Sequence, residues 1–409
     1  MQTLNYIDLF AGAGGLSEGF IRNGYNPIAH VEMDLSACLT LKTRIAYHYL
    51  KKKGKLAYYL SYLKGEIDRE ELYSNVPERK LNSVFNTEIS DQTLHSVFTS
   101  IDSVLDGKKV HVIIGGPPCQ AYSLAGRGRD PNGMKGDKRN YLFTYYAEFL
   151  KRYRPKYFVF ENVKGLLYSD GYYEQMLNLF QSDEVGYHVE SNVLDARKFG
   201  VLQARERVII IGKRGKKPFN YPDFKNKENG WKISRDLFSD LPKLKQGEGE
   251  QWVPYACEST KYLDQFEIRN GIDFVTQHIA RPHNSRDLEI YKKVLDTWMN
   301  EKRRLHYYEL PENLKTHTNQ HVFTDRYKVV DPNGPSHTLV AHISKDGHYY
   351  IHPDPTQNRS ISVREAARIQ SFPDDYFFEG GRTPAFRQIG NAVPPLMAGE
   401  IAKVLKSMF

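Results

Sequence analysis

Strand-like and helix-like segments alternate along the first part of the chain, and this alternation constrains the fold more than any other feature. Residues 4–9 and 26–32 are short apolar runs that predict strands. A helix is expected to begin near Leu16, and a second helix is expected over residues 35–49. Because parallel strands need a crossover between them, the pattern predicts an α/β fold: a mostly parallel sheet with helices on both faces.

A glycine-rich turn joins the first predicted strand to the first helix, and residues 8–15 read Asp-Leu-Phe-Ala-Gly-Ala-Gly-Gly. Such a turn lets backbone approach a ligand closely at a helix N-terminus. The dinucleotide pattern GxGxxG fails here, because Ser17 stands where the third glycine would be. Glu32, at the end of the second strand, can accept hydrogen bonds from ribose hydroxyls. A nucleoside without a pyrophosphate, such as S-adenosylmethionine, satisfies both facts; a tight turn with no ligand is the alternative.

A second sharp break follows the buried strand expected at residues 110–114. Gly115-Gly116-Pro117-Pro118 end that strand, and Cys119 comes next. A thiol at this place lies at the mouth of an open α/β sheet, where ligands bind in such folds. A lone cysteine is more often an inert buried residue, so the assignment of Cys119 as a nucleophile depends on its flanking sequence.

Composition narrows the class of protein. The chain has 409 residues, enough for two domains, and a formal net charge of +8, which suits a polyanionic partner such as nucleic acid. Its three cysteines include no CxxC pair, which argues for a reducing compartment, against disulfides and against a metal site. Neither a signal peptide nor a stretch of membrane-spanning length is visible, so a cytoplasmic protein without a membrane partner is expected.

Six ordered blocks resemble the C5-cytosine-specific DNA methyltransferase family, in its bacterial restriction-modification branch. Two of them are the glycine turn and Gly116-Pro117-Pro118-Cys119-Gln120. The other four are Glu161-Asn162-Val163, Gln203-Ala204-Arg205-Glu206-Arg207-Val208, Arg364-Glu365-Ala366-Ala367-Arg368 and Gly390-Asn391-Ala392-Val393-Pro394-Pro395. The resemblance implies a Rossmann-like, S-adenosylmethionine-dependent methyltransferase sheet with a second, smaller target-recognition domain.

The implied activity is that of a DNA (cytosine-5)-methyltransferase. Cytosine C5 is too weak a nucleophile to take a methyl group from a sulfonium unaided, and addition of a thiolate at C6 makes it an enamine carbon. The resemblance implies transfer from S-adenosyl-L-methionine to C5 of a flipped-out cytosine in a specific short duplex sequence, through a covalent Cys119–C6 adduct. It also implies protection of DNA in a restriction-modification system.

Family resemblance assigns four catalytic residues. Cys119 is the nucleophile, Glu161 holds cytosine N3, and Arg207 contacts the base near O2 and favours the thiolate. Arg205 lines the same pocket, although a structural ion pair or a phosphate contact would also explain it.

The cofactor site is also assigned by resemblance, and so are the DNA contacts, except for Arg281 and Asn284, which belong to a stretch dense in groups able to read base edges or phosphates. In the cofactor site Glu32 contacts the ribose, Met33 the adenine ring, and Glu88 the adenine amino group, where the family often carries Asp. The full cofactor set is Phe10, Ala11, Gly12, Gly14, Gly15, Glu32, Met33, Glu88, Ile89, Pro118, Leu142, Asn391 and Ala392. The expected DNA contacts are Gln120, Ser123, Arg127, Arg129, Arg281, Asn284 and Thr338. For residues 278–286, a buried polar turn is the alternative to base contact.

The block order predicts the domains. Residues 1–213 with 386–409 form the cofactor and catalytic domain, which includes a mobile catalytic loop at 119–140 and an insertion at 50–85 expected to form a helical hairpin. Residues 214–360 form the target-recognition domain, and residues 361–385 form a hinge. Helices are expected at 288–299 and 396–406, the latter packed against the first domain.

Two other functions stay open. One is a tRNA cytosine-5 methyltransferase, although the Cys-Phe-Thr signature of that branch is absent here. The other is a non-catalytic DNA-binding scaffold, which would have no chemical reason to keep Cys119, Glu161 and Arg207 together. The expected partner is double-stranded DNA, the expected state is a monomer, and the family context allows a cognate restriction endonuclease.

Overall fold

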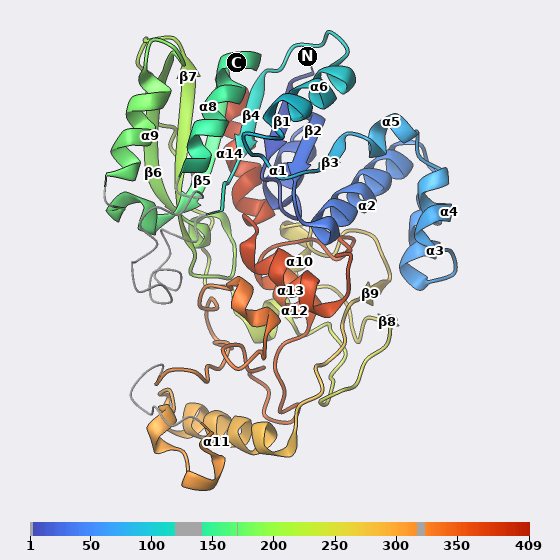
Figure 1. The fold of residues 1–409 in the computed structure, drawn as a ribbon. Helices are drawn as coiled ribbons and strands as arrows, with labels where there is room; N and C mark the ends of the chain where they lie inside the picture. The colour runs from blue at the N-terminus through green and yellow to red at the C-terminus, as the bar shows by residue number, and fades with distance from the viewer. Residues whose placement is uncertain (1–2, 119–140, 170, 317–323) are drawn as a thin grey trace.

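A seven-stranded sheet forms the upper part of the molecule (Figure 1). The computed structural model describes residues 3–118, 141–169, 171–316 and 324–409. Its strands are β1 (Asn5–Leu9), β2 (Asn26–Glu32), β3 (Val84–Asn86), β4 (Val112–Gly115), β5 (Tyr157–Val163), β6 (Tyr187–Asp195) and β7 (Glu206–Arg214), in the order β3-β2-β1-β4-β5-β7-β6. The first five strands of this order are parallel, and β7 runs antiparallel to both β5 and β6. The predicted mostly parallel α/β fold is therefore confirmed.

Helices cover both faces of the sheet because successive strand residues point to opposite sides. Ile113 and Phe158 face a core shared with α6 (Leu94–Leu105), α8 (Leu142–Tyr153) and α9 (Tyr172–Gln181). Their neighbours Val112 and Val159 face the opposite core, which includes α1 (Gly15–Arg22) and the C-terminal helix α14 (Pro395–Ser407). The contact between α1 and α14 is so close that a Cβ on Gly19 would lie 2.4 Å from the backbone nitrogen of Gly399. The last helix therefore belongs to the sheet in space, although a long segment of chain separates them.

We call the described residues of 3–214 and 395–409 the sheet lobe, and those of 216–392 the second lobe, which occupies the lower part of Figure 1. The second lobe contains a two-stranded sheet, β8 (Trp252–Pro254) with β9 (Phe274–Thr276), and the helices α10 (Lys261–Gln265), α11 (Ser285–Glu301), α12 (Val363–Ile369) and α13 (Arg382–Asn391). Its described short turns of 3-10 or π-helix are Ile233–Leu237, Tyr307–Glu309, Glu312–Leu314 and Ala341–Ser344. Much of this lobe is irregular backbone, so many of its carbonyl groups need partners other than strand ladders.

Buried arginines supply many of those partners. Arg364 and Arg368 of α12 and the nearby Arg359 are all fully buried. Arg368 pairs with Asp240 and Asp374 and donates to the Leu237 carbonyl oxygen at 2.6 Å. Each planar guanidinium has five donors and can join several loops at once. The block at residues 364–368 thus holds loops together within the segment that the sequence suggested as a hinge.

The insertion forms three short helices instead of the expected hairpin. They are α3 (Leu56–Lys64), α4 (Arg69–Ser74) and α5 (Glu78–Leu81), and they follow the long helix α2 (Leu35–Lys52). Gly65 ends α3 in the left-handed conformation, and the Asp68 side chain accepts from the Glu71 backbone N–H to begin α4. Pro77 then begins α5, so these local signals divide the segment into three.

Within the parts of the chain that the structure describes, none of the helices combines the length and apolar character needed to span a bilayer.

Candidate active site

The glycine turn lies at the carboxyl edge of the sheet, where β1 ends. Phe10, Gly12 and Gly14 all have positive φ angles, of 56°, 53° and 78°. A Cβ on Gly15 would lie 2.2 Å from the Val393 carbonyl oxygen, so this glycine is required by packing. At Gly12, in contrast, no described atom lies within 4 Å of an added Cβ. The turn is thus packed tightly on one side and open at Gly12, where backbone is accessible to a ligand.

Glu32 connects the end of β2 to this turn. Its Oε2 accepts a hydrogen bond from the Gly12 backbone N–H at 2.8 Å, and its Oε1 accepts from the Asp34 N–H at 2.8 Å. Burial raises the pKa of the Glu32 carboxyl, while these two amides act in the opposite direction. Each oxygen keeps a further lone pair, so the carboxylate can still accept from a ligand hydroxyl.

Other predicted cofactor residues gather around the turn. Met33 is 60% exposed beside Glu32, and Glu88 is exposed just after β3, the strand that pairs with β2. Ala392 approaches from the other side, since its Cβ would lie 3.2 Å from a Cβ on Gly15. Asn391, which precedes it, is exposed at the end of α13. Ile89 is buried, Leu142 begins α8, and Pro118 is exposed at the end of the described segment.

Glu161 and Arg207 form an ion pair at the same edge of the sheet. Arg207 Nε lies 2.8 Å from Glu161 Oε1, and both side chains are about nine-tenths buried, with 12% and 11% exposed. The pair forms because β7 runs antiparallel to β5, which places Arg207 opposite Val163 at the carboxyl end of β5. A parallel strand would have carried its first residues to the far edge.

This ion pair lies against the segment that leads to Cys119. A Cβ on Gly116 would lie only 2.5 Å from Glu161 Oε2, so glycine is required for the carboxylate to approach the backbone there. The neighbouring Asn162 side chain donates to the Pro117 carbonyl oxygen at 3.3 Å. Cys119 follows two residues later and lies outside the described residues, together with Gln120, Ser123, Arg127 and Arg129.

The other two cysteines are poor candidates for the nucleophile. Cys38 is buried, burial raises the pKa of its thiol to about 12, and its Sγ donates to the Glu32 carbonyl oxygen at 3.3 Å. Cys257 is exposed in the second lobe, where its Sγ donates to the Ser239 carbonyl oxygen at 3.4 Å. A thiolate is needed for nucleophilic attack, and Cys38 stays protonated near neutral pH.

Comparison with known proteins shows the family of this chain. The sequence model of the C-5 cytosine-specific DNA methylase family matches residues 4–58 and 63–407. The chain belongs to this family. It is 43% identical to the type II methyltransferase M.Bpa9945I of Bacillus paralicheniformis, with 98% of each chain covered. It is 32% identical to the type II methyltransferase M.DdeI of Desulfomicrobium norvegicum, covering 99% of this chain and 89% of the relative.

The fold is also that of solved relatives. A prophage-encoded E. coli protein, described as a DNA modification methyltransferase, superposes with a TM-score of 0.63 at 22% identity, covering 99% of both chains. The family match and the type II methyltransferase relatives make the protein a C-5 cytosine DNA methyltransferase.

In this methyltransferase Arg205 lies behind the site, although the sequence suggested that it lines the pocket. Its side chain is fully buried and donates to three backbone carbonyl oxygens: Leu339 at 2.6 Å, Ala392 at 2.9 Å and Gly390 at 3.1 Å. These contacts join the start of β7 to Leu339 and to the end of α13, where Ala392 packs on the glycine turn. We infer that Arg205 is a positioning residue.

Arg205→Ala should therefore destabilise the protein and loosen the cofactor site. The Ala392 carbonyl oxygen keeps a donor in Gln370 Nε2, but those of Leu339 and Gly390 lose theirs. Each buried carbonyl left without a partner costs about 1–3 kcal/mol, so we expect a loss of at least about 2 kcal/mol in unfolding free energy. Denaturant unfolding measures this loss, and calorimetry should show weaker methyl-donor binding. A variant of normal stability that lacks only methyl transfer would instead show that Arg205 acts on the substrate.

Two buried glutamines complete the surroundings of Arg205. Gln203 Oε1 accepts from the Leu339 backbone N–H at 2.8 Å, and Gln370 Nε2 donates to the Ala392 carbonyl oxygen at 2.6 Å. Neither was among the predicted site residues. Gln203 begins the block that contains Arg205, and Gln370 follows the block at 364–368 by two positions. Their place in or beside these blocks is the sequence signal that could have identified them.

The residues expected to contact DNA in the second lobe make contacts within the protein. Arg281 is buried and donates to the carbonyl oxygens of Lys345 at 2.5 Å and Ile343 at 3.1 Å. Asn284 caps α11, with its side chain accepting from the Asp287 N–H at 2.8 Å. Thr338 Oγ1 donates to the Ala204 carbonyl oxygen at 2.5 Å. For Arg281 these contacts favour the buried polar turn that the sequence left as the alternative.

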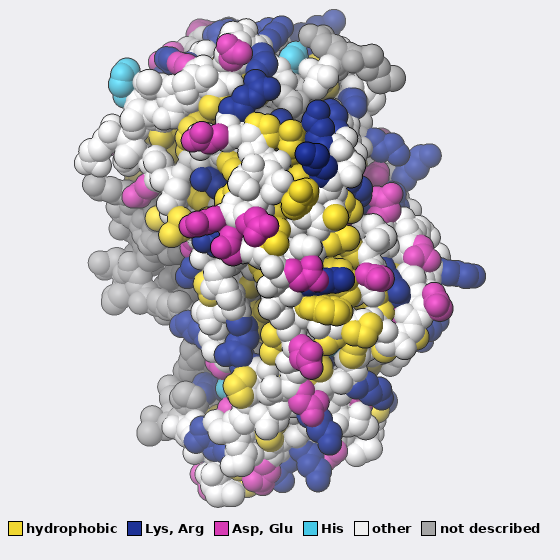
Figure 2. Space-filling view, turned by 90° about the vertical axis from the view of Figure 1, so that its right-hand side faces the viewer, with side chains coloured by type: hydrophobic (Ala, Val, Ile, Leu, Met, Phe, Trp, Pro, Cys, Tyr) yellow, Lys and Arg dark blue, Asp and Glu magenta, His cyan; other side chains and the backbone are white. Residues whose placement is uncertain are grey.

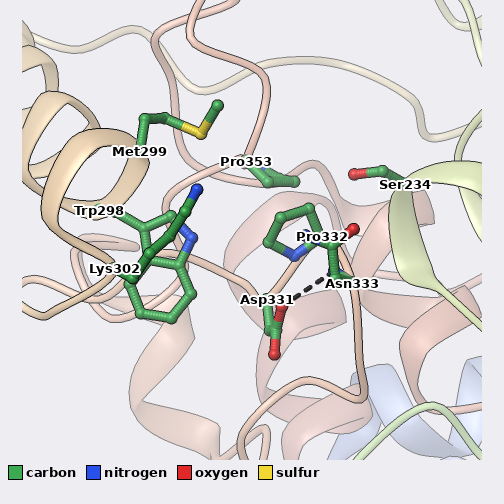
Figure 3. Close-up of a pocket in the computed structure, with 8 residues that line it drawn as sticks. All are labelled: Ser234, Trp298, Met299, Lys302, Asp331, Pro332, Asn333 and Pro353. Carbon is green, nitrogen blue, oxygen red and sulfur yellow. Dashed lines mark hydrogen bonds between the residues drawn. The ribbon is translucent and has the colours of Figure 1, made fainter.

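A hollow of about 440 Å³ lies elsewhere, beside the end of α11 (Figure 3). Trp298, Met299 and Lys302 form one wall, opposite Pro353 and Ser234. Below them Asp331 accepts from the Asn333 backbone N–H at 2.9 Å. Among the residues that the structure describes, none of those predicted for catalysis or cofactor binding lines this hollow.

Proposed function

We propose that this protein transfers the methyl group of S-adenosylmethionine to C5 of a flipped-out cytosine in a short, specific duplex DNA sequence, through a transient bond between Cys119 and C6. One observation carries the proposal. The strand order β2-β1-β4-β5-β7 places Glu32, the glycine turn, the segment leading to Cys119, Glu161 and Arg207 next to one another along a single sheet edge. Glu32 and the glycine turn thus lie on one side of β4, and Glu161 and Arg207 lie on the other.

The described residues fit the methyl donor that the family uses. The open backbone at Gly12 leaves room for a ligand, and the Glu32 carboxylate, held by two amides, would contact the ribose hydroxyls. The exposed Met33 side chain would lie against the adenine ring. When bound, S-adenosylmethionine supplies an electrophilic methyl group on a sulfonium. The protein's part is to orient that group and exclude water.

The remaining groups act on the base. The Cys119 thiolate bonds to C6, and the electron pair of the C5–C6 double bond becomes available at C5. Glu161 holds cytosine N3, and Arg207, oriented by its contact with Glu161, stabilises the charge that develops beside O2. After C5 gains the methyl group, C5 loses its proton to a base, the C6–S bond breaks and the thiolate is restored.

Methyl transfer from tritiated S-adenosylmethionine tests this function. Purified protein should label duplex DNA and leave tRNA unlabelled. Label in tRNA alone would establish the RNA alternative, and absence of label in both, with duplex binding retained, would establish a scaffold.

We also propose a restriction-modification role, supported by the 43% identical type II methyltransferase. Mapping of methylated sites in expressing cells should give one short motif modified at nearly every occurrence.

We further propose that residues 214–360 choose the target sequence. A flipped cytosine is the same at every site, so flanking bases must be read by groups outside the pocket. Exchange of residues 214–335 with those of a relative of different specificity, keeping core residues such as Leu237, Tyr262 and Leu263, should change the methylated motif. An unchanged motif in an active exchange variant would refute this assignment. Replacement of the cation Arg127 should weaken binding to all sequences alike.

Glu32→Ala should weaken S-adenosylmethionine binding by about 1.5–3 kcal/mol, the range for a hydrogen bond to a charged group. Calorimetry measures the change, and turnover at saturating cofactor should remain.

Because burial raises the pKa of Glu32, its carboxylate is protonated at a higher pH than an exposed glutamate and then loses acceptor capacity. Affinity should therefore fall as the pH is lowered toward that pKa, and Glu32→Gln should remove this pH dependence.

A further inference from the structure

One part of the insertion is not explained by family membership. The family match is interrupted at residues 59–62, which lie within α3. Two of these four residues are tyrosines that point inward: Tyr59 is fully buried and Tyr62 is half-buried. Both make contacts with the second lobe, so this part of α3 joins two parts of the molecule.

The first set of contacts is with residues 375–379, between α12 and α13. The Tyr59 hydroxyl donates to the Asp375 carbonyl oxygen at 2.6 Å, and the Tyr62 hydroxyl donates to Glu379 Oε1 at 2.6 Å. The ring of Tyr62 also meets that of Phe377 edge to face, with centroids 5.7 Å apart. Glu379 is buried, so its carboxylate depends on partners of this kind.

The second set of contacts is with the β8–β9 pair. Phe274 of β9 is buried in the same apolar cluster as Tyr59 and Leu63 of α3. The ammonium group of Lys64 lies 5.0 Å from the ring centre of Phe274 and 5.1 Å from that of Trp252. Figure 2 views the side of the molecule from which α3 and α4 project, and a band of apolar side chains crosses the middle of this face.

The segment that follows β9 leads to the start of α11. Gln277 comes directly after β9, and its side chain bonds to Phe378 twice: Nε2 donates to the carbonyl oxygen at 2.8 Å, and Oε1 accepts from the N–H at 3.1 Å. Residues 278–286 follow, in which Arg281 bonds to the Lys345 and Ile343 carbonyl oxygens and Asn284 caps α11. The insertion therefore contacts both segments, 375–379 and β9, that support this stretch.

We propose that α3 is a brace, formed by Tyr59, Tyr62, Leu63 and Lys64, which positions residues 274–286 relative to the catalytic edge of the sheet. Without it, those residues would be held to the sheet lobe by fewer contacts, and duplex bound between the lobes would be presented less precisely to Cys119. The proposal rests on the proposed function in this respect: a positioning effect on catalysis requires that the protein methylates DNA.

The test compares two variants of α3. Tyr59→Phe/Tyr62→Phe/Lys64→Ala removes both hydroxyl contacts and the cation while keeping both rings. The matched control is Tyr58→Phe/Lys55→Ala. It changes the same residue types at two exposed positions: Tyr58 lies in α3, and Lys55 directly precedes this helix. We expect the first variant to raise KM for duplex DNA about tenfold, with kcat and the Kd for S-adenosylmethionine within about twofold, and the control to match the native protein.

Hydrogen exchange provides a readout that does not depend on activity. Amides in residues 274–286 and 375–379 should exchange faster in the brace variant, while those of β4 and β5 should not change. Unchanged exchange in these segments would overturn the brace, and so would a general loss of protection with lower kcat, which would indicate a purely structural role. If the native protein failed to methylate DNA, the proposed function would fail, and the exchange result would still decide whether the brace exists.

Discussion

We expect Cys119→Ala to abolish turnover and covalent trapping of DNA while duplex binding persists. Native protein with S-adenosylmethionine should form a stable adduct with duplex that carries 5-fluorocytosine at the target. Elimination requires that C5 lose its hydrogen as a proton. Fluorine at C5 cannot be removed in this way, so the reaction stalls at the covalent adduct after methyl transfer. Removal of a nucleophile that works with its neighbours as a unit lowers kcat by roughly 10⁴- to 10⁶-fold. Denaturing electrophoresis detects the adduct, and fluorescence anisotropy measures duplex binding.

Cys257→Ala is the matched control for this prediction, since Cys257 is exposed in the second lobe. That variant should trap the substrate as efficiently as the native protein. An adduct that survives in Cys119→Ala would place the nucleophile elsewhere. Cys38 is then a poor substitute, because burial raises the pKa of its thiol to about 12.

Glu161→Gln should lower kcat by about 10²–10⁴-fold, the usual contribution of a positioned acid–base group. The amide keeps the size of the side chain and an oxygen for Arg207 Nε, but it loses the charge that holds the 2.8 Å ion pair. Affinity for S-adenosylmethionine should not change, because Glu32 and the glycine turn lie on the other side of β4. Single-turnover kinetics measure the chemical step, and calorimetry measures cofactor binding.

Glu206→Gln controls for charge loss at a neighbouring position. Glu206 begins β7 but is exposed, and its carboxylate pairs with Lys164 at 3.0 Å. This variant should keep kcat within about twofold, as expected for a surface ion pair. If Glu161→Gln weakened cofactor binding and left the chemical step intact, the assignments of Glu161 and Glu32 would both be wrong.

Several elements were predicted from local sequence alone. The strand at residues 26–32 and the helix beginning at Leu35 are observed as β2 and α2. The helix expected at 288–299 is observed over Ser285–Glu301. Asn284 caps its N-terminal end. Such elements depend on apolar periodicity and capping residues within a few positions, which a sequence displays directly. The helical hairpin predicted for the insertion was wrong. Gly65, Asp68 and Pro77 are local stop and start signals too, and they divide the segment into three helices.

The sequence by itself determined which chemical groups the site contains and which short elements carry them. Tertiary structure decided which of two similar residues enters the site. Arg205 and Arg207 are two positions apart in one block, yet Arg207 reaches Glu161 while Arg205 bonds to carbonyl groups at Leu339, Gly390 and Ala392. Those partners lie more than 130 residues away in the chain. Their approach depends on the return of α14 to the sheet and on the antiparallel direction of β7, and no local pattern in the sequence encodes either.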